Sequence, residues 1–169
     1  MKKGINKGKS NNYKKKVDEE TVNNIKVIGC DIGGVIRNVL ENTPIPGAIE
    51  AIRRIAEIHQ IMFISKCKEN FKESSNDFLK KNNLDNFPVC YCDEYDGKIS
   101  IAIKYNVSVM IDDKMQVLTT FPENIIKIWI CDDENKIEGA KKYQPEYLKQ
   151  VVHAKNWDDI LKYFSLLLP

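Results

Sequence analysis

The chain has 169 residues, a hydrophobic fraction of 43% and a formal net charge of +2. This length supports one domain with one hydrophobic core. No stretch approaches the roughly 20 apolar residues that cross a bilayer, and the amino terminus is too polar for a secretory signal, so we expect a soluble, cytoplasmic protein.

The positive charge is concentrated at the amino terminus. Residues 1–16 contain seven lysines and no acid, which leaves 19 basic and 24 acidic residues in the remainder. Such a segment is typical of a disordered, solvated tail. We expect this tail over residues 1–22, followed by a single domain over residues 23–169. The alternative is an arm that binds nucleic acid, with binding that is salt-dependent and lost without residues 1–16.

Five short apolar runs, rich in Ile and Val, predict buried strands. They are residues 26–31, 61–65, 88–92, 107–112 and 125–131. Helical patterns separate or follow them: residues 46–58, a segment with Phe71, Phe78 and Leu79 that ends near Asn82, residues 99–105, and a closing amphipathic helix from Trp157 to Leu167, capped by Asn156. This alternation predicts an α/β fold with a parallel sheet and helices on both faces.

The five cysteines do not form a disulfide framework. Their number is odd, and three lie in or beside apolar runs, so we expect reduced thiols. Cys90 and Cys92 are separated by one residue, but no second pair of ligands completes a zinc site. His59 and His153 stand alone and are expected to be packing or surface residues.

Polar residues follow the predicted strands at the points where they end. Asp31 follows the first strand, Ser65 the second, and Asp112 and Asp113 the fourth, while Lys98 lies at the start of the helix before the fourth strand. Because right-handed crossovers bring all the strand ends to one edge of a sheet, these side chains are expected to converge.

This set of residue types suits phosphoryl transfer. A carboxylate such as Asp31 attacks phosphorus and forms an acyl-phosphate. Carboxylates such as Asp112 and Asp113 suit Mg²⁺, which neutralises the nucleophile and the phosphoryl oxygens. Ser65 and Lys98 stabilise charge on the equatorial oxygens. Each residue also has a simpler interpretation: Asp31 as a turn residue, Ser65 and one of the acidic pair as helix caps, and Lys98 as a surface lysine.

From about Ile25 to Leu168 the chain resembles the haloacid dehalogenase (HAD) superfamily of Mg²⁺-dependent phosphohydrolases. Residues 30–35 match its first motif except at one place, Ser65 its second, and Asp112-Asp113 its fourth; Lys98 and Lys104 compete for the third. The resemblance implies a Rossmann-like three-layer sandwich with a five-stranded, mostly parallel sheet.

The resemblance also implies roles for individual residues. The Mg²⁺ ligands would be Asp31, Asp112, Asp113 and the carbonyl of Gly33. The phosphate-binding residues would be Ser65, Lys66, Lys98 and Gly34. The residues from Asp96 to Lys114, and the late segment from Asn156 to Ile160 with its Trp157, are similar to the deoxyribonucleotidase-like branch of the superfamily.

Cap domains determine substrate specificity in this superfamily, and the segments between the motifs of this chain are short for such a domain. Only 34 positions separate Asp31 from Ser65, and 33 separate Ser65 from Lys98. A capless member resembles enzymes that act on exposed phosphates. The expected partners are therefore a phosphorylated small molecule, a nucleotide or a macromolecular phosphate, with no membrane, and with a homo-oligomer as one way to close the site.

One position departs from the superfamily pattern. Gly33 stands where the superfamily has a second aspartate, which acts as the general acid and base; such a group contributes about 10²–10⁴-fold. Two hypotheses follow. The protein is a slow or selective phosphatase that uses a good leaving group or another acid, for which Asp93 and Glu94 are candidates. Alternatively, it binds Mg²⁺ and a phosphorylated ligand without efficient turnover.

Overall fold

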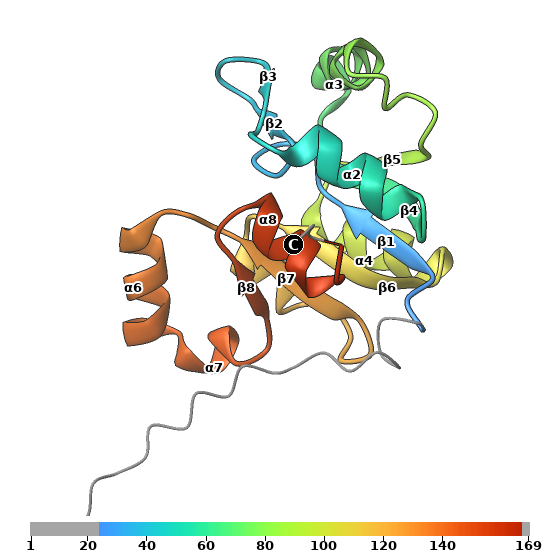
Figure 1. Ribbon diagram of the computed structural model, residues 1–169. Coiled ribbons are helices and arrows are strands. Elements are labelled where there is room, and N and C mark those ends of the chain that lie inside the picture. The colour runs from blue at the N-terminus through green and yellow to red at the C-terminus, as the bar shows by residue number, and fades with distance from the viewer. Residues whose placement is uncertain (1–23, 167–169) are drawn as a thin grey trace, which may run out of the picture.

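The central feature of the fold is a sheet of six parallel strands in the order β5-β4-β1-β6-β7-β8 (Figure 1). The strands are β1 (Val27–Cys30), β4 (Gln60–Lys66), β5 (Val89–Cys92), β6 (Val107–Asp112), β7 (Ile126–Ile130) and β8 (Val152–Ala154). The computed structural model describes residues 24–166, so the predicted basic tail and Leu167 lie outside the described residues.

All five predicted strands are present, and the prediction of five strands was one short. β8 was missed because it has only three residues and no apolar run. It is held at the sheet edge by parallel pairing with β7, in which Ile128 lies opposite Val152 and Ile130 opposite Ala154. This is a tertiary constraint that local sequence does not carry.

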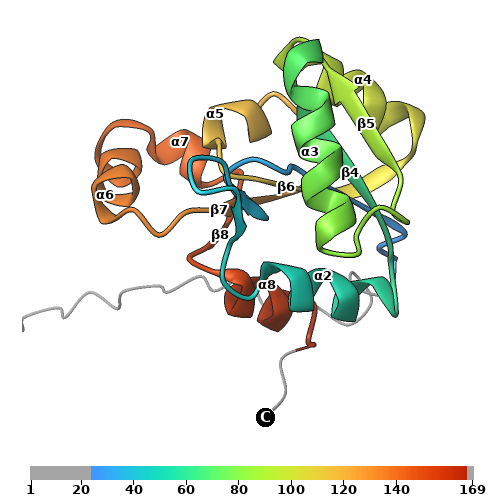
Figure 2. The same ribbon diagram turned by 90° about the horizontal axis from the view of Figure 1, so that it is seen from above.

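Helices cover both faces of the sheet, which confirms the predicted three-layer α/β sandwich. One buried cluster contains side chains of α2 (Ala48–Ala56), α3 (Glu69–Lys81) and α8 (Trp157–Tyr163). A separate cluster contains side chains of α4 (Tyr95–Lys104), α5 (Met115–Leu118) and α6 (Glu134–Tyr143), with α7 (Pro145–Leu148) packed against it. Figure 2 shows α2 and α8 together on one side of the strands and α5 and α7 on the other. No helix within residues 24–166 has the length and apolar character needed to cross a bilayer.

The last helix is anchored to the loop that follows β1. As predicted, Asn156 caps α8, with its side chain accepting a hydrogen bond from the Asp159 N–H at 3.0 Å. Trp157 is buried, and its indole N–H donates to the Val35 carbonyl at 2.9 Å. Because Val35 lies four residues after Asp31, this contact fixes the backbone beside the candidate nucleophile.

Helix α4 begins four residues earlier than the predicted helix at Ile99. Glycine lowers helix propensity by about 1 kcal/mol relative to alanine, so Gly97 does not favour a helix that begins before it. The structure requires glycine there: a Cβ on Gly97 would lie 2.6 Å from the Cβ of Cys92. The glycine therefore lets α4 begin directly against β5, which places Lys98 in the first turn of the helix.

A small hairpin that the sequence did not predict follows β1. It consists of β2 (Arg37–Asn38) and β3 (Thr43–Pro44), paired antiparallel. Arg37 fastens it to α3, donating to Ser74 Oγ at 2.6 Å and Ser75 Oγ at 3.2 Å. The hairpin depends on partners far along the chain, so local sequence gives no signal for it.

The two helical glycines of α4 and α6 give opposite predictions for stability. Gly97→Ala forces overlap with Cys92 and should destabilise the protein by about 1–3 kcal/mol. Gly139→Ala meets nothing within 4 Å and should stabilise it by up to about 1 kcal/mol through helix propensity. Urea unfolding of both variants measures the difference, and equal midpoints would contradict the close approach of α4 to β5.

Candidate functional site

The strand order creates a crevice at the carboxyl ends of β1 and β6. From β1 the chain passes to β4 on one side, and it later returns to β6 on the other side. Helices therefore leave the two neighbouring strand ends in different directions, which is where open α/β sheets bind ligands. Asp31 directly follows β1 and Asp112 ends β6, and the Asp31 N–H donates to the Ile111 carbonyl at 3.0 Å.

A buried lysine joins these two carboxylates. Nζ of Lys98 lies 2.9 Å from Oδ2 of Asp31 and 2.6 Å from Oδ2 of Asp112. Lys98 and Asp112 are both 0% exposed, and Asp31 is 5% exposed. A buried ammonium needs partners of this kind, because an unpaired charge in the interior is very costly. Burial by itself lowers the pKa of Lys98, but Asp31 and Asp112 outweigh it and raise that pKa above its usual range.

One lysine does not neutralise two carboxylates, and this affects the pKa of Asp112. Burial and the nearby Asp31 charge raise the pKa of Asp112 to about 6, although Lys98 and the Lys114 N–H work in the opposite direction. The Lys114 N–H donates to Oδ1 of Asp112 at 2.9 Å. Asp31 and Asp112 together therefore carry more negative charge than Lys98 neutralises, and a cation bound beside them would offset the excess.

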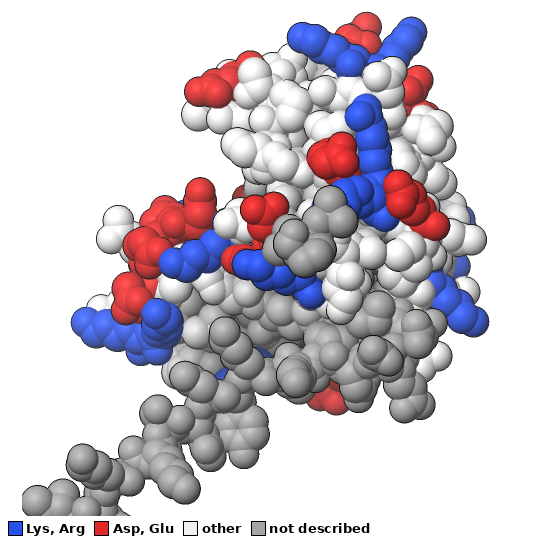
Figure 3. Space-filling model, in the orientation of Figure 1, with Lys and Arg blue, Asp and Glu red and all other residues white. Residues whose placement is uncertain are grey.

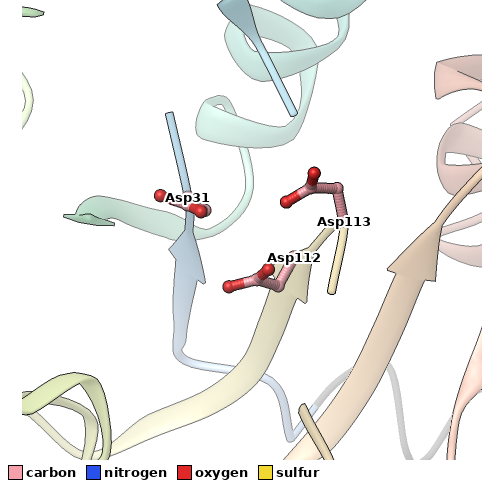
Figure 4. A group of neighbouring side chains, drawn as sticks. All are labelled: Asp31, Asp112 and Asp113. Carbon is pink, nitrogen blue, oxygen red and sulfur yellow. The ribbon is translucent and has the colours of Figure 1, made fainter. Parts of the chain in front are cut away.

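Asp113 completes a group of three carboxylates. Asp31, Asp112 and Asp113 each offer an oxygen, and these oxygens lie within 4.8 Å of one another. Figure 4 shows Asp31 at the end of β1 facing the two aspartates at the end of β6. The indole N–H of Trp129 holds the Asp113 carbonyl at 3.1 Å. Three carboxylate oxygens are the donor set that hard divalent cations such as Mg²⁺ prefer, so the residues fit the predicted metal.

Gly34 makes room for this arrangement. Its φ is +78°, a left-handed conformation that side chains rarely adopt, and a Cβ would lie 2.4 Å from Oδ2 of Asp113. Gly33 is different, because a Cβ there would meet only Cγ2 of Val39, at 3.1 Å. Gly34 is therefore required by the backbone and by Asp113, whereas Gly33 faces the tip of the hairpin.

A pocket of about 290 Å³ lies at two of these carboxylates, whereas the third, Asp112, is fully buried and outside its lining. Asp31 and Asp113 lie in its wall together with Gly33, Gly34, Val39, Ser65, Lys66, Tyr95 and Lys114. Nζ of Lys66 lies 4.3 Å from the centroid of the Tyr95 ring, a cation–π contact that holds the ammonium at the pocket. The pocket therefore combines carboxylates at its base with a hydroxyl and an ammonium on the β4 side.

The structure brings together most of the residues that the sequence singled out. Ser65, Lys66, Gly33 and Gly34 line the pocket, and Lys98 joins the carboxylates beneath it. Lys104, the competitor of Lys98, is exposed, with its Nζ 5.3 Å from the centroid of the Tyr105 ring. Asp93 and Glu94, the candidate replacement acids, are exposed and outside the pocket lining.

The alternative roles as helix caps are not seen. Helix α3 has Lys68 at its N-cap, and α5 has Lys114, so neither Ser65 nor the acidic pair caps the helix that follows. Asp133, which is exposed, caps α6 by accepting from the Asn135 and Lys136 N–H groups. All five cysteines are free, with no disulfide bond among them. His153 packs on Trp129, with ring centroids 4.9 Å apart.

Sequence reasoning missed Val39, Tyr95 and Lys114 as pocket residues. Lys114 directly follows the acidic pair, so its position was a usable signal. Tyr95 follows β5 at the same sheet edge as Ser65, but a single tyrosine after a strand has no chemical partner in the sequence. Val39 reaches the pocket only because Arg37 ties the hairpin to α3.

Comparison with solved structures identifies the fold. A haloacid dehalogenase-like hydrolase from Burkholderia xenovorans is similar, with a TM-score of 0.52 over 79% of this chain. This chain has a haloacid dehalogenase-like fold. The sequence identity is 14%, and the match spans 64% of the length of that protein. No family model matches the chain. No curated protein gives a significant match. The HAD-like fold is therefore the finding, and the deoxyribonucleotidase-like branch stays a prediction.

The pKa of Asp112 predicts an unusual pH dependence of stability. Its value is about 6 in the folded protein and about 3.9 in an unfolded chain, so the folded state binds the proton more tightly. The charged form therefore destabilises the metal-free protein above pH 6, and stability is regained as the pH falls toward 4. Asp112→Asn should stabilise the protein at pH 7.5 by on the order of 2–3 kcal/mol, with no gain at pH 4.

Urea unfolding at several pH values in a chelating buffer makes this measurement. Asp132→Asn, which removes an exposed carboxylate outside the site, is the matched control and should change stability by less than about 0.5 kcal/mol. Added Mg²⁺ should stabilise the wild type but have little effect on Asp112→Asn. A loss of stability in Asp112→Asn at pH 7.5 would contradict the charge imbalance.

Proposed function

We propose that this protein is a Mg²⁺-dependent phosphohydrolase in which Asp31 is the nucleophile. The observation that carries the proposal is the ion-paired set of Asp31, Lys98 and Asp112 at the base of a pocket that also contains Ser65 and Lys66. Along the sequence, Asp31, Ser65, Lys98 and Asp112 occur in the order of the four superfamily motifs that the chain resembles. The HAD-like fold is consistent with hydrolase chemistry of this type.

The protein's own residues orient the nucleophile. The Ile32 N–H donates to Oδ1 of Asp31 at 2.8 Å, and Lys98 holds Oδ2, so the carboxylate is fixed before a substrate arrives. Such preorganisation lowers the cost of reaching the reactive geometry. In the proposed complex, Ser65 and Lys66 contact the phosphoryl oxygens from the β4 side. Mg²⁺ bound at Asp31, Asp112 and Asp113 would supply the positive charge that lets an anionic nucleophile approach an anionic phosphate.

The absence of a side chain at Gly33 supports a second candidate function. The space beside Gly33 is bordered by the Val39 methyl group, and it contains no side chain that could exchange a proton with a leaving group or with water. On this alternative the protein binds Mg²⁺ and a phosphorylated ligand but turns it over inefficiently. Substitutions at the nucleophile and at Gly33 separate the two functions.

The first test is a phosphatase screen of the full chain with Mg²⁺, comparing the wild type with Asp31→Asn. The amide keeps the shape of the side chain but is a much weaker nucleophile, so kcat should fall by roughly 10³-fold or more. Release of inorganic phosphate is the measurement. Turnover that survives Asp31→Asn would exclude the mechanism, and an inactive wild type that binds Mg²⁺ and phosphate would favour the binding function.

The second test restores a side chain at position 33. Gly33→Asp should raise kcat for alkyl phosphates by about 10²–10⁴-fold if only the acid and base are missing. The new Cβ would lie 3.1 Å from the Val39 methyl, so the hairpin tip must shift by a few tenths of an ångström. Gly33→Asn imposes the same steric demand without the carboxyl and is the control. Equal rates in the two variants would show that the carboxyl is not the missing part.

A further inference from the structure

A second cavity adjoins the phosphate pocket. It has a volume of about 480 Å³, larger than the 290 Å³ of the pocket itself, and the two share Asp113 and Lys114 in their walls. A ligand with its phosphate in the pocket can therefore extend past Asp113 and Lys114 into the second cavity. This cavity, called here the side groove, is large enough for the organic part of a small substrate.

The side groove has a mixed lining, in which apolar and aromatic side chains lie beside charged and amide ones. One face of α6 forms a wall, with Gly139, Ala140 and Tyr143 at the spacing of one helical turn. Met115 of α5 and Trp129 of β7 lie in the same lining. Tyr143 is 72% exposed, and Nζ of Lys142 lies 4.9 Å from the centroid of its ring. A Cβ on Gly139 would meet nothing within 4 Å, so this part of the groove is open.

Fixed contacts hold these walls. The Trp129 indole donates to the Asp113 carbonyl, and its ring packs on His153. Gln116 Nε2 donates to Gln144 Oε1 at 3.2 Å, which joins α5 to the end of α6. Figure 3 shows charges of both signs near α6. Glu138 and Glu134 pair there with Lys141 and Lys155, at 2.7 Å and 2.6 Å. Both glutamates of α6 are therefore paired with lysines, and the exposed aromatic side chain of the groove lining is Tyr143.

The phosphate pocket independently restricts the leaving group. Among the described residues that line it, the carboxyls are Asp31 and Asp113, which the proposed function uses as nucleophile and metal ligand. The remaining described lining residues include no further carboxyl and no imidazole, the groups that most often act as general acids near neutral pH. An alkoxide leaving group needs a proton from such an acid, whereas a phenolate, with a pKa of about 10, leaves far more readily unprotonated.

We propose that the substrate is an aryl phosphate monoester, whose ring lies in the side groove against Tyr143 and α6 while its phosphate lies at Asp31. This inference rests on the proposed function and specifies its substrate class. An Asp31 oxygen forms a bond to phosphorus, and the bond from phosphorus to the aryl oxygen breaks. The aryl oxygen leaves with the electron pair as a phenolate and takes its proton from water. Water then cleaves the acyl-phosphate, which releases phosphate and restores Asp31.

Binding of two phosphonates to the full chain with Mg²⁺ tests this placement without turnover. Phenylphosphonate and methylphosphonate present the same anionic group, and only the first carries a ring. Burying the ring should make phenylphosphonate bind roughly tenfold to a hundredfold more tightly in calorimetry. In Gly139→Leu, where a side chain fills the open part of the groove, this preference should fall to within about threefold, while methylphosphonate binds as in the wild type.

Glu138→Leu is the matched control, because it adds the same side chain to α6 at an exposed position outside the groove lining. It should keep the preference for the ring. Tyr143→Ala, which opens the groove instead of filling it, should also weaken the preference. A preference that persists unchanged in both Gly139→Leu and Tyr143→Ala overturns the proposal. Failure of both phosphonates to bind the wild type would instead count against the phosphate site, and thus against the proposed function.

Turnover measurements distinguish two possible kinds of aryl phosphate substrate, a small molecule and a protein. Phenyl phosphate represents small aryl esters, and a phosphotyrosyl peptide represents a protein substrate. The kcat/KM for phenyl phosphate should exceed that for ethyl phosphate by at least tenfold, or the kcat/KM for the phosphotyrosyl peptide should exceed that for the matching phosphoseryl peptide by the same factor. The aryl substrate with the higher kcat/KM identifies the source of the ring. Equal kcat/KM for aryl and alkyl esters would overturn the proposal.

Discussion

The structure depends on one buried ion pair network, the Lys98 ammonium between the carboxylates of Asp31 and Asp112. It links the first turn of α4 to the end of β6, the next strand along the chain, and to the end of β1, which is far away in the sequence. A buried lysine and two buried aspartates are individually unfavourable, and they are tolerated together because their charges are paired. The positions of the proposed nucleophile and of the proposed metal ligands Asp31 and Asp112 both depend on this contact.

The same network leaves the site with excess negative charge, which suits its proposed work. Two carboxylates share one ammonium, and burial together with the nearby charge of Asp31 raises the pKa of Asp112 to about 6, so a bound divalent cation would favour the charged form of Asp112. Proteins commonly give up some stability at functional sites in this way. Gly34, with its positive φ and its close approach to Asp113, is a backbone feature of the same kind, required by the site and not by the core.

Much of this could be predicted from the sequence, because strand ends are marked by the change from apolar to polar residues. Asp31, Ser65 and Asp112 were placed at one sheet edge by that signal. The choice between Lys98 and Lys104 could not be made, because six residues on a helix separate them by roughly 120° around its axis, and the facing side depends on how α4 packs. The hairpin of Arg37 and the short β8 were missed because tertiary partners create them.

The central claim is that Asp31, Asp112 and Asp113 share one divalent ion above Lys98. Anomalous diffraction from crystals soaked in Mn²⁺, which accepts the same oxygen ligands as Mg²⁺, tests it most directly. The account predicts a single strong anomalous peak within coordination distance of oxygens from all three aspartates, with Lys98 still paired to Asp31 and Asp112. Carboxylates that point apart, with no peak between them, would contradict the account.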